Sequence, residues 1–231
     1  MDVSYFLQQR LKFIQQFYNM ASAPFIDRKR LIEAEEEPFI PPYSESEYPE
    51  PYFLEEWIEA NESIQVLGCL CISMLSNVFK TYFEEWERLI GMPKNEEIKN
   101  AFNKGFLNGY KAYFAEYYNI RFEESPAKLA ILEEITLARN KTQHTESIVS
   151  NTHSYSYSEL KKLRPPFFIN NLGRSLFNEA TQNDDEWFEF LTLFEDTSMQ
   201  ITGEKLFAAI SEIERFTEWL ETKKAQQNNQ L

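Results

Sequence analysis

The sequence predicts an all-α protein: an up-and-down helical bundle with an extra N-terminal helix and short C-terminal helices. Only six of its 231 residues are glycine and valines are few, whereas Glu, Lys, Gln, Leu and Ala are abundant. This composition favours helix over sheet, and apolar residues recur at helical spacing in several long segments. With 43% hydrophobic residues, including twenty Phe and twelve Tyr, the chain can build a sizeable core, and we expect a single domain over residues 1–231.

Residues 1–37 are expected to form an N-terminal helical extension. Its first helix covers residues 3–18 and should pack on the body of the protein with one apolar side, which carries Phe6, Phe13, Ile14 and Phe17. Pro24 should end that helix, and Asp27 should cap a second, shorter one.

Residues 38–52 have a different composition. Five prolines forbid a regular helix, and three glutamates make the segment acidic. We interpret it as an irregular surface connector that its tyrosines anchor to the body. The alternative is a segment that binds a partner or inhibits the protein.

Residues 53–145 should hold the core helices and the functional motif. The longest helical pattern runs from about residue 52 to residue 90, and Gly91 and Pro93 follow it as a glycine and a proline after a helix end should. This central helix is either continuous or broken near Asn61.

A third helix is predicted over residues 95–118, with Asn95 as its cap. It carries a ridge of aromatic residues at helical spacing: Phe102, Phe106, Tyr110, Tyr113 and Tyr117. Stacking on nucleic-acid bases is one use of such a ridge, but the helical spacing favours core packing. Gly105 and Gly109 lie four residues apart, which indicates that another helix approaches closely there.

The next helix is predicted for SPAKLAILEEITLARNKTQH, residues 125–144, with Ser125 as its cap. Its apolar stripe consists of Ile131, Leu132, Ile135 and Ala138. Arg139 follows at the end of that stripe, so its guanidinium should face a core or an interface and needs a carboxylate or a phosphate as partner. We interpret Glu133 and Glu134 as a solvated helix face.

The run R-N-K-T-Q-H, from Arg139 to His144, resembles the Arg–polar residue–spacer–His signature of HEPN domains. These domains are all-α, and many are metal-independent ribonucleases of toxin–antitoxin and phage-defence systems, in which the 2′-hydroxyl of the RNA attacks the adjacent phosphate. The resemblance implies that His144 is the general acid/base and that Arg139 holds the phosphate. It also implies that Asn140 orients the substrate or the histidine, and that Lys141 is at most an auxiliary substrate-binding charge.

Helix geometry constrains this site. On a straight α-helix, residues five apart point about 140° away from each other, so Arg139 and His144 would not face one point. Either the helix bends or ends between them, or a second subunit completes the site. The resemblance favours a homodimer, because HEPN domains typically pair with their motifs in a shared cleft. The structural alternative is that the two side chains cap carbonyls or bridge to a glutamate on the same helix.

The net charge of −14 argues against broad, nonspecific binding of DNA or RNA. A nuclease of this charge needs a local basic site, for which the sequence offers Lys161, Lys162, Arg164 and Arg174. The alternative is that these are ordinary solvated charges. His153, in a serine-rich stretch, is the weaker of the two candidate histidines.

The sequence lacks the motifs of several common catalytic and cofactor-binding sites. It has no phosphate-binding loop, dinucleotide fingerprint or nucleophile elbow, and neither histidine belongs to a Glu-x-x-His pair, so we expect no metal and no cofactor. Cys69 and Cys71, the two cysteines, are interpreted as buried free thiols. The N-terminus lacks a signal-peptide pattern, and the most apolar run is short for a membrane span, so we expect a cytoplasmic protein without membrane contact.

Residues 146–231 should form the C-terminal helices. We expect a short helix capped by Ser158, further short helices within residues 167–180 and 184–196, and a long helix over residues 202–224. The remaining tail should fray.

The function that the resemblance implies is a dimeric, metal-independent endoribonuclease acting on RNA, as a toxin or a phage-defence effector, with an antitoxin or another protein as a further partner. Two alternatives remain open at this point. One is a catalytically inert helical interaction module, and the other is a module that binds nucleotides without cleaving RNA.

Overall fold

The computed structural model describes residues 2–42, 51–143, 153–163, 165–180 and 197–228. The predicted all-α class is confirmed: these residues form helices and connections, without a strand. One isolated bridge pairs Ser154 with Ser198.

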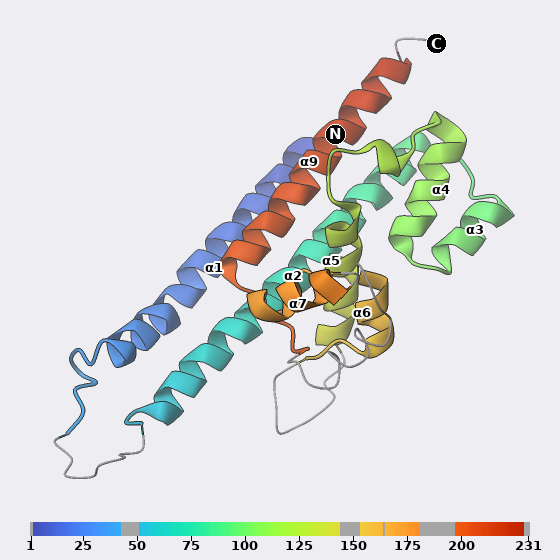
Figure 1. Cartoon of the computed structure of the whole chain (residues 1–231). Helices are drawn as coiled ribbons and strands as arrows, with labels where there is room; N and C mark the ends of the chain where they lie inside the picture. Colours follow the sequence, from blue (N-terminus) through green and yellow to red (C-terminus); the bar gives the residue numbers. More distant parts are fainter. Residues whose placement is uncertain (1, 43–50, 144–152, 164, 181–196, 229–231) are drawn as a thin grey trace.

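Three long helices lie side by side and give the molecule its elongated shape (Figure 1). They are α1 (Val3–Glu33), α2 (Leu54–Ile90) and α9 (Gly203–Asn228). α1 runs antiparallel to α2, and α9 packs against both. A shorter helix, α5 (Leu129–Thr142), packs on α2 and α9 and completes the bundle.

The remaining helices are short. α3 (Glu96–Phe102) and α4 (Phe106–Tyr118) pack on each other and lie beside the C-terminal part of α2 (Figure 1). A 3-10 turn, η1 (Phe122–Glu124), leads from α4 toward α5. The last two, α6 (Tyr157–Leu163) and α7 (Asn171–Ala180), follow α5 in the chain.

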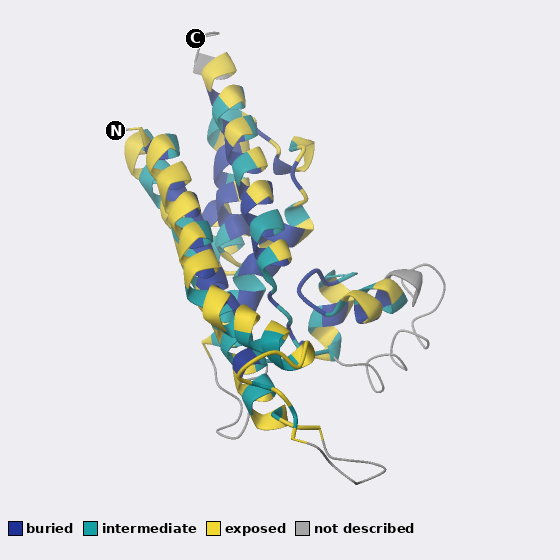
Figure 2. Cartoon of the chain, turned by 90° about the vertical axis from the view of Figure 1, so that its left-hand side faces the viewer, coloured by how far each residue is buried: buried dark blue, intermediate teal, exposed yellow. Residues whose placement is uncertain are grey.

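The core is built from aromatic rings where α2, α4 and α9 meet. Phe83 stacks on Tyr110 at 4.7 Å between ring centroids and lies 5.9 Å from Phe122 and 6.0 Å from Phe216. All four side chains are buried, and Figure 2 shows the buried residues along the inner faces of the helices. The predicted aromatic ridge therefore serves core packing, since Tyr110 and Tyr113 are buried within it.

A polar contact closes the bundle at the C-terminal part of α9. The Glu221 carboxylate accepts hydrogen bonds from Ser4 of α1 (3.1 Å) and from Tyr82 (2.6 Å) and Trp86 (2.9 Å) of α2. One turn further, the Lys224 ammonium lies directly over the Trp86 ring. It is buried and has no hydrogen-bond partner in the described part of the chain. Burial lowers the pKa of this lysine to about 8, although nearby Glu221 opposes the shift.

α1 is longer than predicted. It continues through Pro24, where we expected a break, and Asp27 lies inside the helix, paired with Arg30 at 3.2 Å. Proline removes the hydrogen bond to the carbonyl four residues earlier, that of Met20. Both Met20 and Pro24 are exposed, so the lost bond lies on the solvent side, where water can replace it.

The prediction of which side of α1 is buried was wrong in part. The buried face consists of Val3, Leu7, Leu11, Ile14 and Tyr18. Of the predicted set only Ile14 belongs to it, and Phe6, Phe13 and Phe17 are exposed. Residues 38–42 and 51–53 are irregular, as expected for the connector, whose residues 43–50 lie outside the described ranges.

Between residues 54 and 118, the predicted end of the long central helix agrees with the structure, but the predicted third helix is two helices. α2 is continuous past Asn61 and ends before Gly91, which has the positive φ of 66° that glycine tolerates. The predicted third helix is divided in two by a turn at Gly105, which has a φ of 122°. Of the close approaches expected at Gly105 and Gly109, the one at Gly109 is found, since a side chain there would overlap the Phe102 ring of α3. At Gly105 a side chain would meet only that of Asn108, at an ordinary contact distance, among the described residues.

The C-terminal region departs from prediction mainly at helix ends. α6 is capped by Ser156 instead of Ser158: the Ser156 carbonyl accepts from Leu160 N, and the Glu159 carboxylate accepts from Ser156 N at 2.8 Å, as in a capping box. α9 extends beyond the predicted end at residue 224, to Asn228, and its buried side carries Leu206, Ile210, Ile213, Phe216 and Leu220. The helix expected within 184–196 lies outside the described residues.

By length and composition alone, α2 could cross a membrane, and 44% of its most apolar window is buried inside the protein. In this structure α2 packs against α1, α5 and α9. The core helix of a helical bundle has the same kind of neighbours and can have the same length and composition. The expectation of a protein without membrane contact stays a prediction.

Candidate functional site

The predicted motif lies at the C-terminal end of α5. The helix buries the predicted stripe (Ile131, Leu132, Ile135 and Ala138) against its neighbours. It starts at Leu129, later than expected, and Ser125 accepts instead from Ala127 N at 3.1 Å in the preceding turn. The Glu212 carboxylate of α9 accepts from Lys128 N at 2.8 Å, so a distant side chain takes the role expected of Ser125.

Arg139 is half-buried at this helix end. Its Nη1 donates to the Asn140 side-chain oxygen at 3.1 Å, and its Nε is buried without a hydrogen-bond partner. Among the described residues no carboxylate pairs with it, and in particular it does not bridge to Glu133 or Glu134. A half-buried guanidinium with an unsatisfied N–H group is suited to hold an anion.

The two residues after Arg139 differ in their surroundings. Asn140 is exposed. Lys141 forms an ion pair with Glu159 of α6 at 3.0 Å, and both side chains are largely covered. The arrangement therefore brings Arg139 and Asn140 together and directs Lys141 to an acidic partner, where its charge is in part neutralised.

α5 ends between the two main residues of the motif. Its last residue is Thr142, whose hydroxyl bonds to the Arg139 carbonyl at 2.9 Å and shares a hydrogen bond of 3.0 Å with Ser73 of α2. His144 lies outside the described residues. α5 thus ends before His144, and the completion of the site by a second subunit stays a prediction.

Glu134 is a buried carboxylate, and the prediction that it lies on a solvated helix face was wrong. Glu133 is exposed as expected, but Glu134 is only 1% exposed. Its carboxylate accepts from the Tyr155 hydroxyl (3.0 Å) and from the backbone N–H groups of Phe167 (2.6 Å) and Phe168 (2.8 Å). Burial raises the pKa of Glu134, and these hydrogen bonds oppose the shift.

The sequence did contain a signal for this burial. Glu134 lies three residues after Ile131 and four before Ala138, which is a position on the apolar stripe. A carboxylate at such a position has to be buried with partners. The partners lie about 20 to 35 residues further along the chain, so no local pattern reveals them.

Two cations lie near Glu134. Lys205 of α9 is buried and donates to the Ile169 carbonyl, and its pKa falls to about 8 because of burial and the repulsion of Arg174. The Arg174 guanidinium lies 5.0 Å from the centre of the Phe167 ring. This buried polar cluster fixes residues 165–170 against α5 and α9, which is a structural role.

The other candidate residues are placed as follows. Lys161 and Lys162 are exposed on α6, His153 is half-buried, and Arg164 lies outside the described residues. The free thiols are confirmed: Cys71 is buried and Cys69 half-buried, and burial raises the pKa of each to about 11. Within the described ranges no three His, Cys, Asp or Glu side chains gather as a metal site would require.

Comparisons with protein-family models, with curated proteins and with solved structures found no match to this chain. The HEPN resemblance therefore depends on the motif residues and on their position at the end of α5.

Proposed function

We propose that the protein is a metal-independent endoribonuclease of the HEPN type that acts in the cytoplasm as a toxin or a phage-defence effector. The observation that carries this proposal is the state of Arg139. It is held at the end of α5 with a buried, unpartnered Nε and with no carboxylate partner among the described residues. An arginine so placed gains a charge-assisted hydrogen bond when a phosphate oxygen binds.

The chemistry follows from the residue types. The 2′-hydroxyl of the RNA attacks the adjacent phosphorus and loses its proton to a base, the bond from phosphorus to the 5′-oxygen breaks, and that oxygen receives a proton. The products are a 2′,3′-cyclic phosphate and a free 5′-hydroxyl. The pKa of an ordinary histidine lies near neutrality, so His144 is suited to the proton transfer, and the guanidinium of Arg139 stabilises the charge that builds on the phosphate.

Asn140 and Lys141 have smaller parts in this proposal. The Asn140 side-chain oxygen accepts from Arg139 and keeps the guanidinium oriented. Lys141 contributes positive charge beside the site, which its ion pair with Glu159 neutralises in part. The acidic total charge limits long-range attraction of RNA. The substrate should therefore be a particular RNA, or an RNA that a partner protein delivers. An antitoxin would be a further partner that controls the activity.

The test is cleavage of RNA by the purified chain in EDTA, followed by analysis of the product ends. We expect His144→Ala to reduce the rate by at least about 100-fold, in line with the contribution of a general acid or base. His153→Ala is the matched control, because it removes the other histidine of the chain, and it should leave the rate unchanged. Cleavage by His144→Ala at the wild-type rate contradicts the proposal, as does the absence of cleavage by the wild type on any RNA.

Arg139 offers a second, independent variant. Arg139→Lys keeps the positive charge but loses the forked donor pair, so we expect a rate well below that of the wild type. Arg88, an exposed arginine that pairs with Glu85 at 2.8 Å, provides the control substitution Arg88→Lys.

The same Arg139, whose Nε has no hydrogen-bond partner among the described residues, supports one alternative, a module that binds nucleotide phosphate without cleaving RNA. This alternative predicts that a nucleotide raises the melting temperature of the wild type, that Arg139→Ala abolishes the shift and that no RNA is cleaved. Cleavage by the wild type that depends on His144 rules it out.

A further inference from the structure

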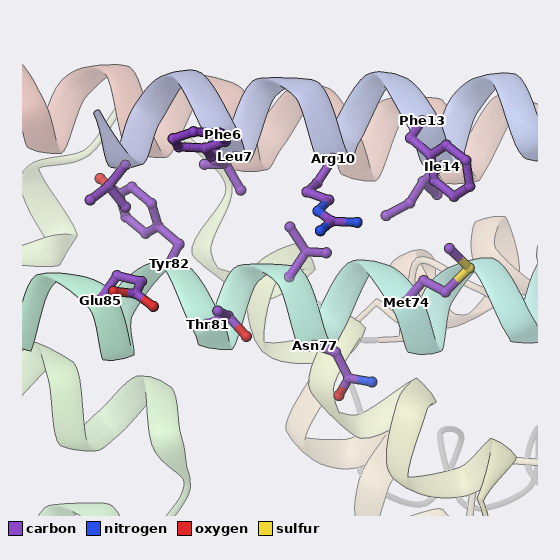
Figure 3. Close-up of a pocket in the computed structure, with 12 residues that line it drawn as sticks. Phe6, Leu7, Arg10, Phe13, Ile14, Met74, Asn77, Thr81, Tyr82 and Glu85 are labelled. Atoms are coloured by element: carbon purple, nitrogen blue, oxygen red, sulfur yellow. The ribbon is translucent and has the colours of Figure 1, made fainter. Parts of the chain in front are cut away.

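α1 and α2 leave an open groove between them on the surface of the bundle (Figure 3). Its volume is about 530 Å³, and each of the two helices contributes six lining residues. Most of the lining is apolar, including Phe6 and Phe13 from α1 and Met74 and Val78 from α2. Arg10 extends from α1 into the middle of the groove.

The α1 side of this groove belongs to a longer apolar stripe. Phe6 is 55% exposed, Phe13 51% and Met20 80%, and Phe17 is also exposed. Together with Arg10 these residues follow alternating spacings of four and three, the repeat of a helix that packs against another helix. Since one aromatic side chain can bury about 200 Å², the three phenylalanines alone expose about 300 Å².

On α2, exposed apolar residues continue from the groove toward the N-terminal end of the helix. Leu70 and Val66 precede Met74 by four and eight residues, so they lie on the same face of α2, and both are exposed. Scattered exposed apolar residues are normal, but a continuous patch of several hundred Å² marks an interaction site.

The charge of α1 suits contact with a second copy of the chain. The protein carries a net charge of −14, so most of its surface should repel another copy. Residues 3–26 contain no acidic residue, and their only charged side chains are Arg10 and Lys12. The α1 stripe is therefore an apolar surface on which two acidic molecules meet with little repulsion between carboxylates.

Part of the stripe is also complementary to itself, namely Phe6, Phe13 and Met20, whereas Phe17 would face Gln9 of the partner subunit. Phe6 and Met20 lie seven residues before and after Phe13. When two copies of α1 lie antiparallel with Phe13 at the two-fold axis, Phe6 of one protomer faces Met20 of the partner subunit. Arg10 then faces Gln16 of the partner subunit, whose amide oxygen can accept from the guanidinium.

We propose that the α1 stripe, formed by Phe6, Arg10, Phe13, Phe17 and Met20, is a homodimer interface in which α1 packs antiparallel on α1 of a second copy. Met20, Val66 and Leu70 add exposed apolar area to the about 300 Å² of the three phenylalanines, and a standard interface buries roughly 800 Å² per partner. The proposal concerns assembly and holds whether or not the chain cleaves RNA.

Sedimentation of the full chain at micromolar concentration tests it. We expect a dimer for the wild type, and Phe13→Glu should raise the dimer dissociation constant by at least about 100-fold, because two carboxylates would be buried against each other at the axis. Leu172→Glu is the matched control, since it places the same charge on another exposed apolar side chain, on α7, and it should leave the dimer intact. Circular dichroism confirms that both variants are folded.

A cysteine placed at the axis gives a second readout. Phe13→Cys should form a reducible dimer under mild oxidation, whereas Asn19→Cys, on the opposite, polar side of α1, should not exceed the background set by Cys69 and Cys71. A wild type that remains monomeric, a Phe13→Glu variant that dimerises as the wild type does, or equal cross-linking at both positions overturns the proposal.

Discussion

Two buried regions of this protein are held together in opposite ways. Around Phe83 the interior is made of aromatic rings packed at 4.7 to 6.3 Å between centroids. Around Glu134 it is made of polar groups, with one carboxylate accepting three hydrogen bonds. Shape and volume decide the stability of the first region. In the second, the identity of one side chain decides it, because three buried donors depend on the same carboxylate.

The aromatic region should show the largest effect of a single substitution. Phe83→Ala removes a fully buried ring that contacts seven other aromatic rings, and we expect it to lower the free energy of unfolding by about 4 kcal/mol. Urea denaturation measures this. Leu172→Ala, on the surface, should change the stability by less than about 0.5 kcal/mol, and equal losses in the two variants would contradict this view of the core.

In the polar region, the loss of stability should depend on whether the substituted side chain can accept hydrogen bonds, more than on its size. Glu134→Ala leaves two backbone N–H groups and a hydroxyl buried without acceptor, and we expect a loss of about 3 kcal/mol. Glu134→Gln keeps the shape and one acceptor oxygen, so its loss in the same denaturation experiment should be about half as large. If Gln is as damaging as Ala, the hydrogen bonds are not what holds residues 165–170.

Lys224 sharpens the comparison, because its buried ammonium has no hydrogen-bond partner within the part of the chain that the structure describes. Its pKa is about 8 in the folded protein and about 10.4 in an unfolded chain. Between these values the unfolded chain binds more protons, so the stability of the wild type should rise with pH. Relative to Lys224→Met, we expect the wild type to gain about 2 kcal/mol from pH 8 to about pH 10.

Chemical denaturation of both proteins across that pH range measures the difference. Lys205→Met is not a suitable control, because Lys205 also donates to Ile169. An exposed lysine is better, and Lys162→Met should show the pH dependence of the wild type. Parallel curves for the wild type and Lys224→Met would contradict the lowered pKa of Lys224.

The smallest effect concerns a helix end fixed by its own sequence. The Asn95 side chain accepts from Ile98 N at 2.8 Å and caps α3, so Asn95→Ala should cost about 1 kcal/mol and Asn95→Asp much less. Thermal unfolding can resolve this. An equal cost for Ala and Asp would show that the side-chain oxygen is not the stabilising group.

These cases explain which features the sequence could predict. Gly91 and Asn95 act on residues within one turn of themselves, and both were predicted correctly. The start of α5 depends on Glu212, which is 84 residues away from Lys128, and the burial of Glu134 depends on donors 33 and 34 residues away. Local patterns do not contain such partners.

The same limit applies to the face of α1 and to the candidate site. Two apolar stripes run along α1, and periodicity alone does not say which of them packs on α2. For the site, the sequence predicted that Arg139 would end an apolar stripe and need a carboxylate or a phosphate as partner. The structure places it half-buried at that helix end, with no carboxylate partner among the described residues. The position of His144 and the ribonuclease function remain predictions that the cleavage experiment decides.

The contact between Ser4 and Glu221 has a consequence for how the chain reaches this structure. The two residues are separated by 217 positions, and Phe216 fills the aromatic core from the same helix. While the protein is being synthesised, α1 and α2 therefore emerge long before α9 can cover them. Folding should be slow for a helical protein, and the nascent helices should expose apolar surface that chaperones recognise.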